Sequence, residues 1–215
     1  QLRDAAAHQL NRRSFGTIGR WGAADPAAMA FLDPPPKAPF EEARGLLRRL
    51  EALTETGVLT AHGEALAGFP LPPRLAHMVL KAAGRGQAMR AAQIAALLTE
   101  RGLGGRDVDL RHRLEAFGRD RSPRGRDART LAERWARAAG REGREASLED
   151  GLLLAFAYPE RIAKARGPLG EFQLVSGRGA FVEATDALAR EPWLAIGELG
   201  GGERRDRILL AAPVD

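Results

Sequence analysis

The sequence contains no cysteine, and this absence excludes several kinds of site. Without a thiol there is no disulfide framework, no zinc–thiolate centre and no cysteine nucleophile. The sequence also lacks an apolar run near the length of about 18 residues that a membrane-spanning helix requires. Its first residues show no basic start followed by an apolar stretch, so they do not form a secretory signal. We therefore expect a cytoplasmic protein that contacts no membrane. The first residue is not Met, which indicates a piece of a longer chain.

The motifs of common catalytic sites are missing as well. There is no G-x-x-x-x-G-K-[ST] sequence to cradle a phosphate, and no serine lies in a nucleophile-elbow pattern. The histidines show none of the spacings of metal ligands; they are His8, His62, His77 and His112. We therefore expect no catalytic residue, cofactor or metal in this chain alone.

Lysine is scarce, so almost all of the positive charge is carried by arginine. The net charge is +5, and Lys37, Lys81 and Lys164 are the only lysines. Between Arg101 and Glu145 there are 13 arginines and 8 acidic residues, a surplus equal to the whole net charge. Arginine suits bidentate phosphate contact. A GC-rich genome would also enrich arginine, alanine and glycine together, but it would not explain the clustering, which includes a basic loop predicted at 118–126.

The first two thirds of the chain show helical patterns. We predict a short helical piece at 26–32, an amphipathic helix over 40–53 and a short helix at 61–68 that Thr60 caps. Pro70 forbids continuation of that helix, and Pro73 starts the next, which extends to about Ala83. Further helices are predicted at 87–99, after Asp107 and after Asp127, so residues 74 to 140 form a small helical bundle.

The pattern changes after Pro159 to short β-rich segments. Residues 171–184 give two runs joined by Ser176-Gly177-Arg178-Gly179, which is a hairpin signal. The segments 192–199 and 206–214 are predicted as further strands. Several short strands in about 45 residues indicate a small barrel or sheet, and we expect it to be incomplete because the sequence stops after the last strand.

The stretch around the prolines carries a specific resemblance. Residues 57–83 read "GVLTAHGEALAGFPLPPRLAHMVLKAA", preceded by "FLDPPP" and "ARGLLRRLEAL". This region resembles the winged-helix segment that follows the two ATPase lobes in DEAH-box helicases. The segments "WGAADPAAMAFLDPPP", "AYPERIAKARG", "FQLVSGRGA", "DALAREPWLAI" and "RDRILLAAPVD" are similar to the bacterial HrpB-type members. The resemblance covers about Trp21 to Asp215, and residues 1–20 do not match well.

The resemblance implies a fold that is mainly α with a C-terminal β portion. It implies a winged-helix domain over 1–80, a ratchet-like helical bundle over 81–145 and a partial OB-like barrel over 146–215. The chain departs from the family because it lacks both ATPase lobes, and with them the site for ATP and Mg. We expect it to end before the barrel and the family's extra C-terminal domain are complete.

The function that the resemblance implies is a nucleic-acid-gripping accessory module of an ATP-dependent helicase. Its expected partners are single-stranded RNA or DNA and the ATPase lobes of the same parent chain. A groove of basic side chains gives such affinity without sequence specificity. The candidate contacts are Arg74, Lys81, Arg106, Arg111 and Arg113 in the helical part, and Arg161, Lys164, Arg166 and Arg178 in the β part. Trp193 and Phe172 could stack bases, although a core role is the expected one for both.

Alternatives stay open at this point. Each of these cations, including the stripe of Arg74, His77 and Lys81, could instead be a solvated surface residue. Arg74 lies in a first helical turn, where the helix dipole disfavours a cation, so we expect it to have an acidic partner or a phosphate. The chain could also be a protein-interaction module that docks activators. A free winged-helix regulator is a third possibility, but residues 61–68 offer only His62 and Glu64 to read bases.

Overall fold

The computed structural model describes residues 37–140, 148–202 and 205–214. The chain divides into two compact units, residues 1–77 and residues 78–215. The helical piece predicted at 26–32 lies outside the described residues. The division into three domains at residues 80 and 145 stays a prediction.

The first unit contains helix α2 (Lys37–Arg49), helix α3 (Ala61–Gly68) and the start of helix α4 (Pro73–Ala83), which runs into the second unit. The predicted cap of α3 is confirmed: the Thr60 hydroxyl accepts a hydrogen bond from the Gly63 N–H at 2.9 Å and donates to the Glu51 carbonyl at 2.6 Å. Helix α2 ends at Arg49, four residues before the predicted end. A turn around Gly57, with φ of +87°, then brings Leu53 and Leu59 into an isolated bridge.

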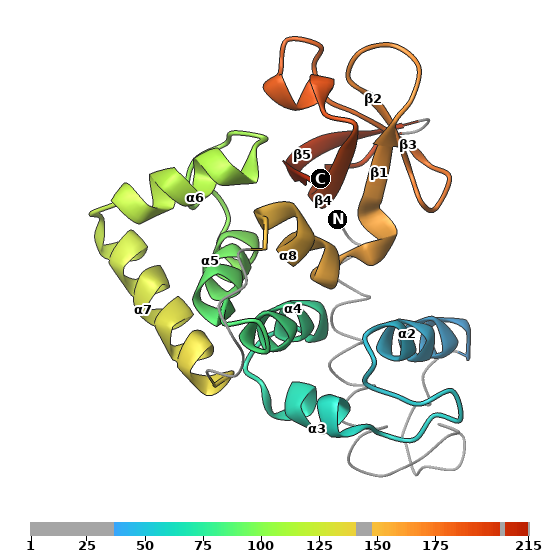
Figure 1. Ribbon diagram of the computed structural model, residues 1–215, viewed down its shortest axis with the longest axis vertical. Coiled ribbons are helices and arrows are strands. Elements are labelled where there is room, and N and C mark those ends of the chain that lie inside the picture. The colour runs from blue at the N-terminus through green and yellow to red at the C-terminus, as the bar shows by residue number, and fades with distance from the viewer. Residues whose placement is uncertain (1–36, 141–147, 203–204, 215) are drawn as a thin grey trace. The chain divides into compact units, whose positions relative to one another are not determined.

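The second unit begins with helices that pack around α5 (Ala88–Thr99). Helix α5 contacts the helices α6 (Leu110–Arg119), α7 (Pro123–Ala138) and α8 (Asp150–Ala157) (Figure 1). Most of the buried residues of α5 are alanines, and their small side chains allow the neighbouring helices to approach closely. Asp150 further fixes helix α8 to α5. Its carboxylate accepts hydrogen bonds from Nε and Nη2 of Arg90, each at 2.7 Å.

Two helix starts differ from the prediction. Helix α6 is capped by Asp109 rather than Asp107, and the Asp109 carboxylate accepts a hydrogen bond from the Arg111 N–H at 2.8 Å. Helix α7 begins at Pro123, four residues before the predicted cap at Asp127, because the Ser122 side chain already caps it. Proline at the first helical position has no N–H to leave unsatisfied, and its φ is preset. The predicted basic loop is therefore mainly the end of one helix and the start of another.

The rest of the second unit is a closed five-stranded barrel. Its strands are β1 (Ile162–Ala165), β2 (Glu171–Leu174), β3 (Gly179–Phe181), β4 (Trp193–Gly200) and β5 (Arg205–Pro213), arranged in the order β1-β2-β3-β5-β4. All pairs are antiparallel except β3 with β5, which is parallel. Short 3-10 helices precede β1, at Pro159–Arg161, and β4, at Ala187–Arg190.

The expectation of a partial barrel is wrong, because the strands form a closed sheet. The barrel is closed by two features that the sequence patterns did not reveal. Strand β1 is only four residues long and carries no β-branched run beyond Ile162, so its pattern is weak. The parallel pairing of β3 with β5 joins strands that are separated by β4 in the sequence, and such pairing leaves no local turn signal.

Inside the barrel lies a core of apolar side chains from all five strands. They include Ala163, Phe172, Leu174, Ala180, Leu194, Ile196, Ile208 and Ala211. Helix α8 packs against β4 and β5 (Figure 1).

Within the described residues, no helix combines the length and the apolar character needed to cross a membrane.

Helix α8 approaches β5 so closely that Gly151 leaves no room for a side chain. A methyl group at this position would collide with the Pro213 carbonyl oxygen. We expect Gly151→Ala to lower the free energy of unfolding by about 1–3 kcal/mol, the usual cost of overpacking. Urea unfolding followed by circular dichroism would measure this. Gly118→Ala is the matched control, because nothing lies within 4 Å of its added methyl group in α6. Equal stability of the two variants would contradict the close packing of α8 on β5.

Candidate nucleic-acid interface

A band of residues crosses all five strands on the outside of the barrel. The register places Lys164 of β1 between Trp193 of β4 and Gln173 of β2. Gln173 pairs with Gly179 of β3, which in turn pairs with Arg205 of β5. The core side chains occupy the alternate positions of the strands, so these five residues face outwards. We call Trp193, Lys164, Gln173, Gly179 and Arg205 the barrel band.

The barrel band combines cations with aromatic rings. The Lys164 Nζ atom lies 5.2 Å from the centroid of the Trp193 ring. The Arg205 guanidinium lies 4.6 Å from the ring centroid of Phe181, which is two residues beyond Gly179 and therefore on the same side of β3. Trp193 is 39% exposed, whereas the sequence predicted a core role for it; the same prediction is confirmed for Phe172, which is buried. The Phe181 ring is half-buried, and Arg205 also pairs with the Glu171 carboxylate. A cation beside an exposed ring, as at Trp193, is the chemistry that binds phosphates and stacks bases of a single strand.

Two further predicted cations lie near the barrel band. Arg166 is exposed and donates a hydrogen bond to the side-chain oxygen of Gln173. Arg178 lies just before β3 and pairs with the buried carboxylate of Asp206 at 2.8 Å, while its own side chain stays 64% exposed. Asp206 also accepts a hydrogen bond from the Gly202 N–H at 3.3 Å. Arg178 therefore neutralises a buried charge from the surface of the barrel.

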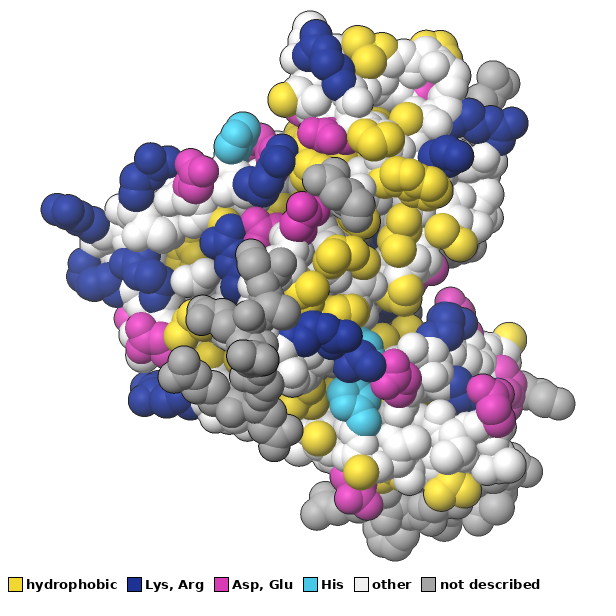
Figure 2. Space-filling model, in the orientation of Figure 1, with side chains coloured by type: hydrophobic (Ala, Val, Ile, Leu, Met, Phe, Trp, Pro, Cys, Tyr) yellow, Lys and Arg dark blue, Asp and Glu magenta, His cyan; other side chains and the backbone are white. Residues whose placement is uncertain are grey.

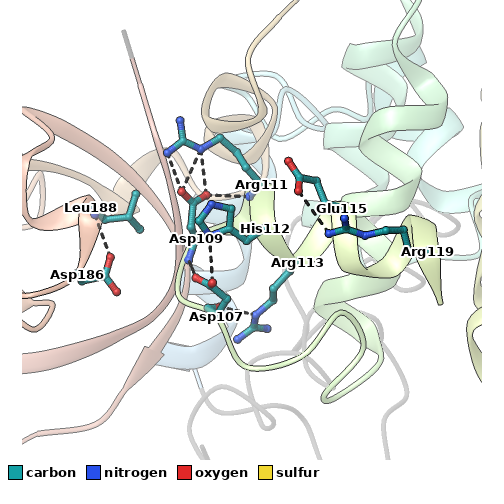
Figure 3. Close-up of polar contacts among 9 residues, drawn as sticks. All are labelled: Asp107, Asp109, Arg111, His112, Arg113, Glu115, Arg119, Asp186 and Leu188. Atoms are coloured by element: carbon teal, nitrogen blue, oxygen red, sulfur yellow. Dashed lines mark hydrogen bonds and ion pairs between the residues drawn. The ribbon is translucent and has the colours of Figure 1, made fainter.

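The start of α6 holds a second group of predicted cations, shown in Figure 3. Arg111 donates hydrogen bonds from Nε and Nη2 to the buried carboxylate of Asp109, at 2.6 to 3.1 Å. The hydrogen bond to Asp109 is the largest cause that raises the pKa of Arg111, although partial burial opposes it. A guanidinium engaged in this way compensates the charge of Asp109 first, because an unpaired buried carboxylate would be costly.

Arg113 lies almost entirely inside the second unit. It is 7% exposed and donates to the carbonyls of Asp107 at 2.6 Å and Leu209 at 3.1 Å. The Glu198 carboxylate lies 3.8 Å from its guanidinium. Arg113 therefore joins the start of α6 to β5, and we leave it out of the proposed interface.

The remaining candidates are spread over the molecule. Arg106 is exposed in the segment before α6. Arg161 donates to the Gly197 carbonyl at 3.0 Å and stacks on the Tyr158 ring at 4.5 Å, so it braces β4. Arg74 and Lys81 are half-buried in α4, on opposite sides of the boundary between the two units. The partner expected for Arg74 stays a prediction.

The structure thus brings only part of the predicted set together. Lys164 and Arg166 lie on neighbouring positions of one barrel face, and Arg178 lies beside β3. Sequence reasoning missed Arg205 and Phe181 because the parallel pairing that places them together has no local signal. It could have found Lys164 as a band residue, since Lys-Ala alternation before a hairpin indicates an outward position.

Comparison with known proteins places these surfaces in a family context. No family model matches the chain. The chain is 38% identical over 199 residues to the ATP-dependent RNA helicase HrpB of Escherichia coli strain K12, a match that covers 91% of this chain. A crystal structure of the E. coli DExH-box NTPase HrpB matches with a TM-score of 0.77 at 35% identity, over 96% of this chain. The resemblance to HrpB-type helicases is thus confirmed.

The match covers only part of HrpB, so it does not transfer the activity of the whole protein to this chain. A crystal structure of the E. coli DEAH/RHA helicase HrpB matches with a TM-score of 0.78 at 33% identity, and the chain covers 25% of it. The chain spans about a quarter of the length of these relatives, which is consistent with a C-terminal region of HrpB. Over the described ranges, no group of three or more His, Cys, Asp or Glu side chains is arranged to hold a metal ion.

The buried position of Arg113 gives a test of its structural role. Arg113→Met would leave the carbonyls of Asp107 and Leu209 without their donors, so we expect the free energy of unfolding to fall by about 2 kcal/mol or more. Arg119→Met is the control, because Arg119 is 78% exposed and its pair with Glu115 is a surface pair worth about 0.5 kcal/mol at most. Urea denaturation of both variants measures the difference, and similar losses would refute the buried role.

His112 and Asp107 form an exposed pair at the start of α6. The His112 Nδ1 lies 3.0 Å from an Asp107 carboxylate oxygen, and this hydrogen bond is the main cause that raises the pKa of His112 above its ordinary value. Because the folded pKa is the higher one, the pair stabilises the fold fully below about pH 6.5 and loses this contribution as the pH rises through the folded pKa.

We expect an NMR titration of His112 to show a midpoint above about 6.5, and Asp107→Asn to lower it. Asparagine keeps an oxygen that can still accept the hydrogen bond from the Asp109 N–H, so the start of α6 is preserved. An unchanged midpoint in Asp107→Asn would show that Asp107 does not set the pKa of His112.

Proposed function

We propose that the chain is the nucleic-acid-gripping accessory module of an ATP-dependent, HrpB-like helicase. The motor is supplied by ATPase lobes that are not part of this sequence. The similarity to HrpB over 91% of the chain supports the helicase assignment, and HrpB is named an RNA helicase. The barrel band is the observation that carries the assignment of binding, because it places cations and aromatic rings side by side on an exposed surface.

We assign the parts of the fold accordingly. The region around α3 and α4 corresponds to a winged helix, α5 to α7 to a ratchet-like bundle, and the closed barrel to an OB-like domain. Support comes from the order of these elements along the chain and from the five-stranded closure of the barrel. OB-like barrels commonly bind single strands through aromatic platforms and basic grooves.

In this proposal the module holds the nucleic-acid strand and catalyses no reaction itself. The motor lobes need a strand that does not slip back while they move. Lys164 and Arg166 supply phosphate contacts, and Arg205 adds one when a phosphate replaces its partner Glu171. Such contacts give affinity for any sequence and weaken as salt rises. The Trp193 ring adds stacking, which tolerates every base because each base has an aromatic face. The expected ligand is therefore a single strand of RNA or DNA.

A protein-docking function is the second candidate. Leu169 and Val175, in the loops that flank β2, are 52% and 70% exposed. Exposed apolar side chains of this kind suit contact with a protein partner. A free winged-helix regulator is less well supported, because α3 presents only His62 and Glu64 as polar side chains.

Substitutions in the barrel band test the single-strand proposal. Trp193→Leu keeps an apolar side chain but removes stacking, so we expect affinity for a fluorescent single-stranded RNA to fall about 5-fold or more. Lys164→Gln should lower the slope of log affinity against log salt by roughly 0.7, the value for removing one phosphate interaction on a single strand. Fluorescence anisotropy over a salt series measures both effects.

The control is Arg190→Gln, an exposed cation in the 3-10 helix before β4 and outside the barrel band. It should leave both the affinity and the slope unchanged. If wild-type chain binds no single strand at low salt, the proposed function fails. If it binds but all three variants behave alike, the strand lies elsewhere than on the barrel band.

A further inference from the structure

The corner where α6 meets α7 carries positive charge that the proposed function does not use. Four arginines lie within eight residues here and a fifth lies in the turn after α5; they are Arg119, Arg121, Arg124, Arg126 and Arg101. All five are exposed. Figure 2 shows Lys and Arg side chains gathered at this end of the two helices, at the left of the view. We call these five residues the arginine corner.

The acidic residue within the corner is engaged in building the turn. The Asp120 carboxylate accepts a hydrogen bond from the Ser122 N–H at 2.8 Å, which lowers the pKa of Asp120. A methyl group added to Gly125 would come within 2.5 Å of the Asp120 carboxyl carbon, so this carboxylate lies directly on the first turn of α7. Asp120 therefore lies at the positive end of the α7 dipole, and the charges of Arg129 and Arg124 add to the lowering of its pKa.

Two arginines of the corner are held by carbonyl groups. Arg124 donates to the Arg101 carbonyl at 2.5 Å, and Arg126 donates to the Arg121 carbonyl. A carbonyl fixes a guanidinium in position but does not neutralise it. Two arginines of the corner also have exposed acidic partners: Glu115 lies 3.6 Å from Arg119, and Glu100 lies 3.4 Å from Arg124. Such surface pairs are weak and exchange readily for a stronger anion. The corner thus holds five exposed cations, of which Arg119 and Arg124 form weak surface pairs that a phosphate can replace.

The surroundings of the corner indicate which anion it fits. The large apolar side chains that are exposed in the described ranges are Val58, Met89, Leu169, Val175, Trp193 and Leu209. None of them lies in residues 119–126 or in the turn after α5, the two segments that carry the arginine corner. A protein interface generally needs an apolar centre, and a single-strand site uses aromatic rings to stack bases. Only phosphate contacts remain for the corner, and a duplex presents its phosphates in regular lines with the bases stacked inside.

We propose that the arginine corner binds the phosphate backbone of duplex nucleic acid without reading its bases. This inference goes beyond the proposed function, which concerns a single strand on the barrel band, and the two surfaces share no residue. A helicase module with both surfaces would contact the unwound strand and the remaining duplex at separate places. Either surface can fail its test without affecting the other.

The test compares a blunt RNA duplex of 20 base pairs with one of its strands alone, using the whole chain. We expect Arg119→Gln/Arg121→Gln/Arg124→Gln/Arg126→Gln to weaken duplex binding by 10-fold or more at low salt. The slope of log affinity against log salt should fall by roughly 0.9 for each phosphate that is no longer neutralised. Single-strand affinity should stay within 2-fold. The control is Arg134→Gln/Arg137→Gln, which removes two exposed arginines from the other end of α7.

A second variant protects the test against loss of folding. Arg119→Gln/Arg121→Gln leaves the carbonyl bonds of Arg124 and Arg126 in place and should still weaken duplex binding about 3-fold or more. Circular dichroism checks that each variant is folded. Trp193→Leu should not change duplex affinity.

Three outcomes would overturn the proposal. An equal loss of duplex affinity in Arg134→Gln/Arg137→Gln and in Arg119→Gln/Arg121→Gln would mean that only the total charge matters. An equal loss for the single strand would place the corner on the single-strand path. Binding of poly-glutamate as tightly as the duplex would indicate an acidic protein partner instead of nucleic acid.

Discussion

Strand β5 is the element on which the second unit depends. It pairs with β4 along most of its length and with β3 in parallel, and this second pairing closes the barrel. The same strand receives the other elements. The Ala211 N–H donates to the Val108 carbonyl at 2.9 Å, the Leu209 carbonyl accepts from Arg113, and Gly151 of α8 packs against Pro213. Barrel closure and the attachment of α6 and α8 are therefore consequences of where one strand lies.

The joint between α6 and β5 explains why several predicted binding residues serve the fold instead. Asp109, Arg113 and Asp206 are all buried in the second unit. Buried charges cost free energy unless they are paired and hydrogen-bonded, so each of them requires partners nearby. Arg111 supplies the partner of Asp109, and Arg178 supplies that of Asp206. Part of the arginine surplus in the sequence thus compensates internal charges, and the net charge overstates what is available to a ligand.

The sequence predicts local structure well where a residue has a specific conformational effect. Thr60 caps α3, and Pro73 starts α4, because both residues act through their own backbone or side chain. The Ser122-Pro123 start of α7 was equally local, and Asp127 was preferred wrongly. The closed barrel was not predictable in this way, since the pairing of β3 with β5 depends on residues far apart in the chain. A core role was also expected for Trp193, although it begins β4 and faces outwards with 39% of its surface exposed.

The same distinction governs the candidate site. The number of cations can be read from a sequence, but the group that each cation contacts cannot. That contact decides how much of the cation's charge is available to a ligand. Arg111 and Arg178 face carboxylates, so their local field is largely cancelled. Arg126 faces a carbonyl, which orients a guanidinium and leaves its full charge in place, and Arg124 adds to such a bond only a weak surface pair with Glu100. The barrel band adds a third case, because Lys164 lies against an aromatic ring, which attracts the cation without neutralising it. Arg205 of the barrel band belongs partly to the first kind, because it pairs with the Glu171 carboxylate. A polyanion is therefore drawn most strongly to Lys164 on the barrel band and to the arginine corner.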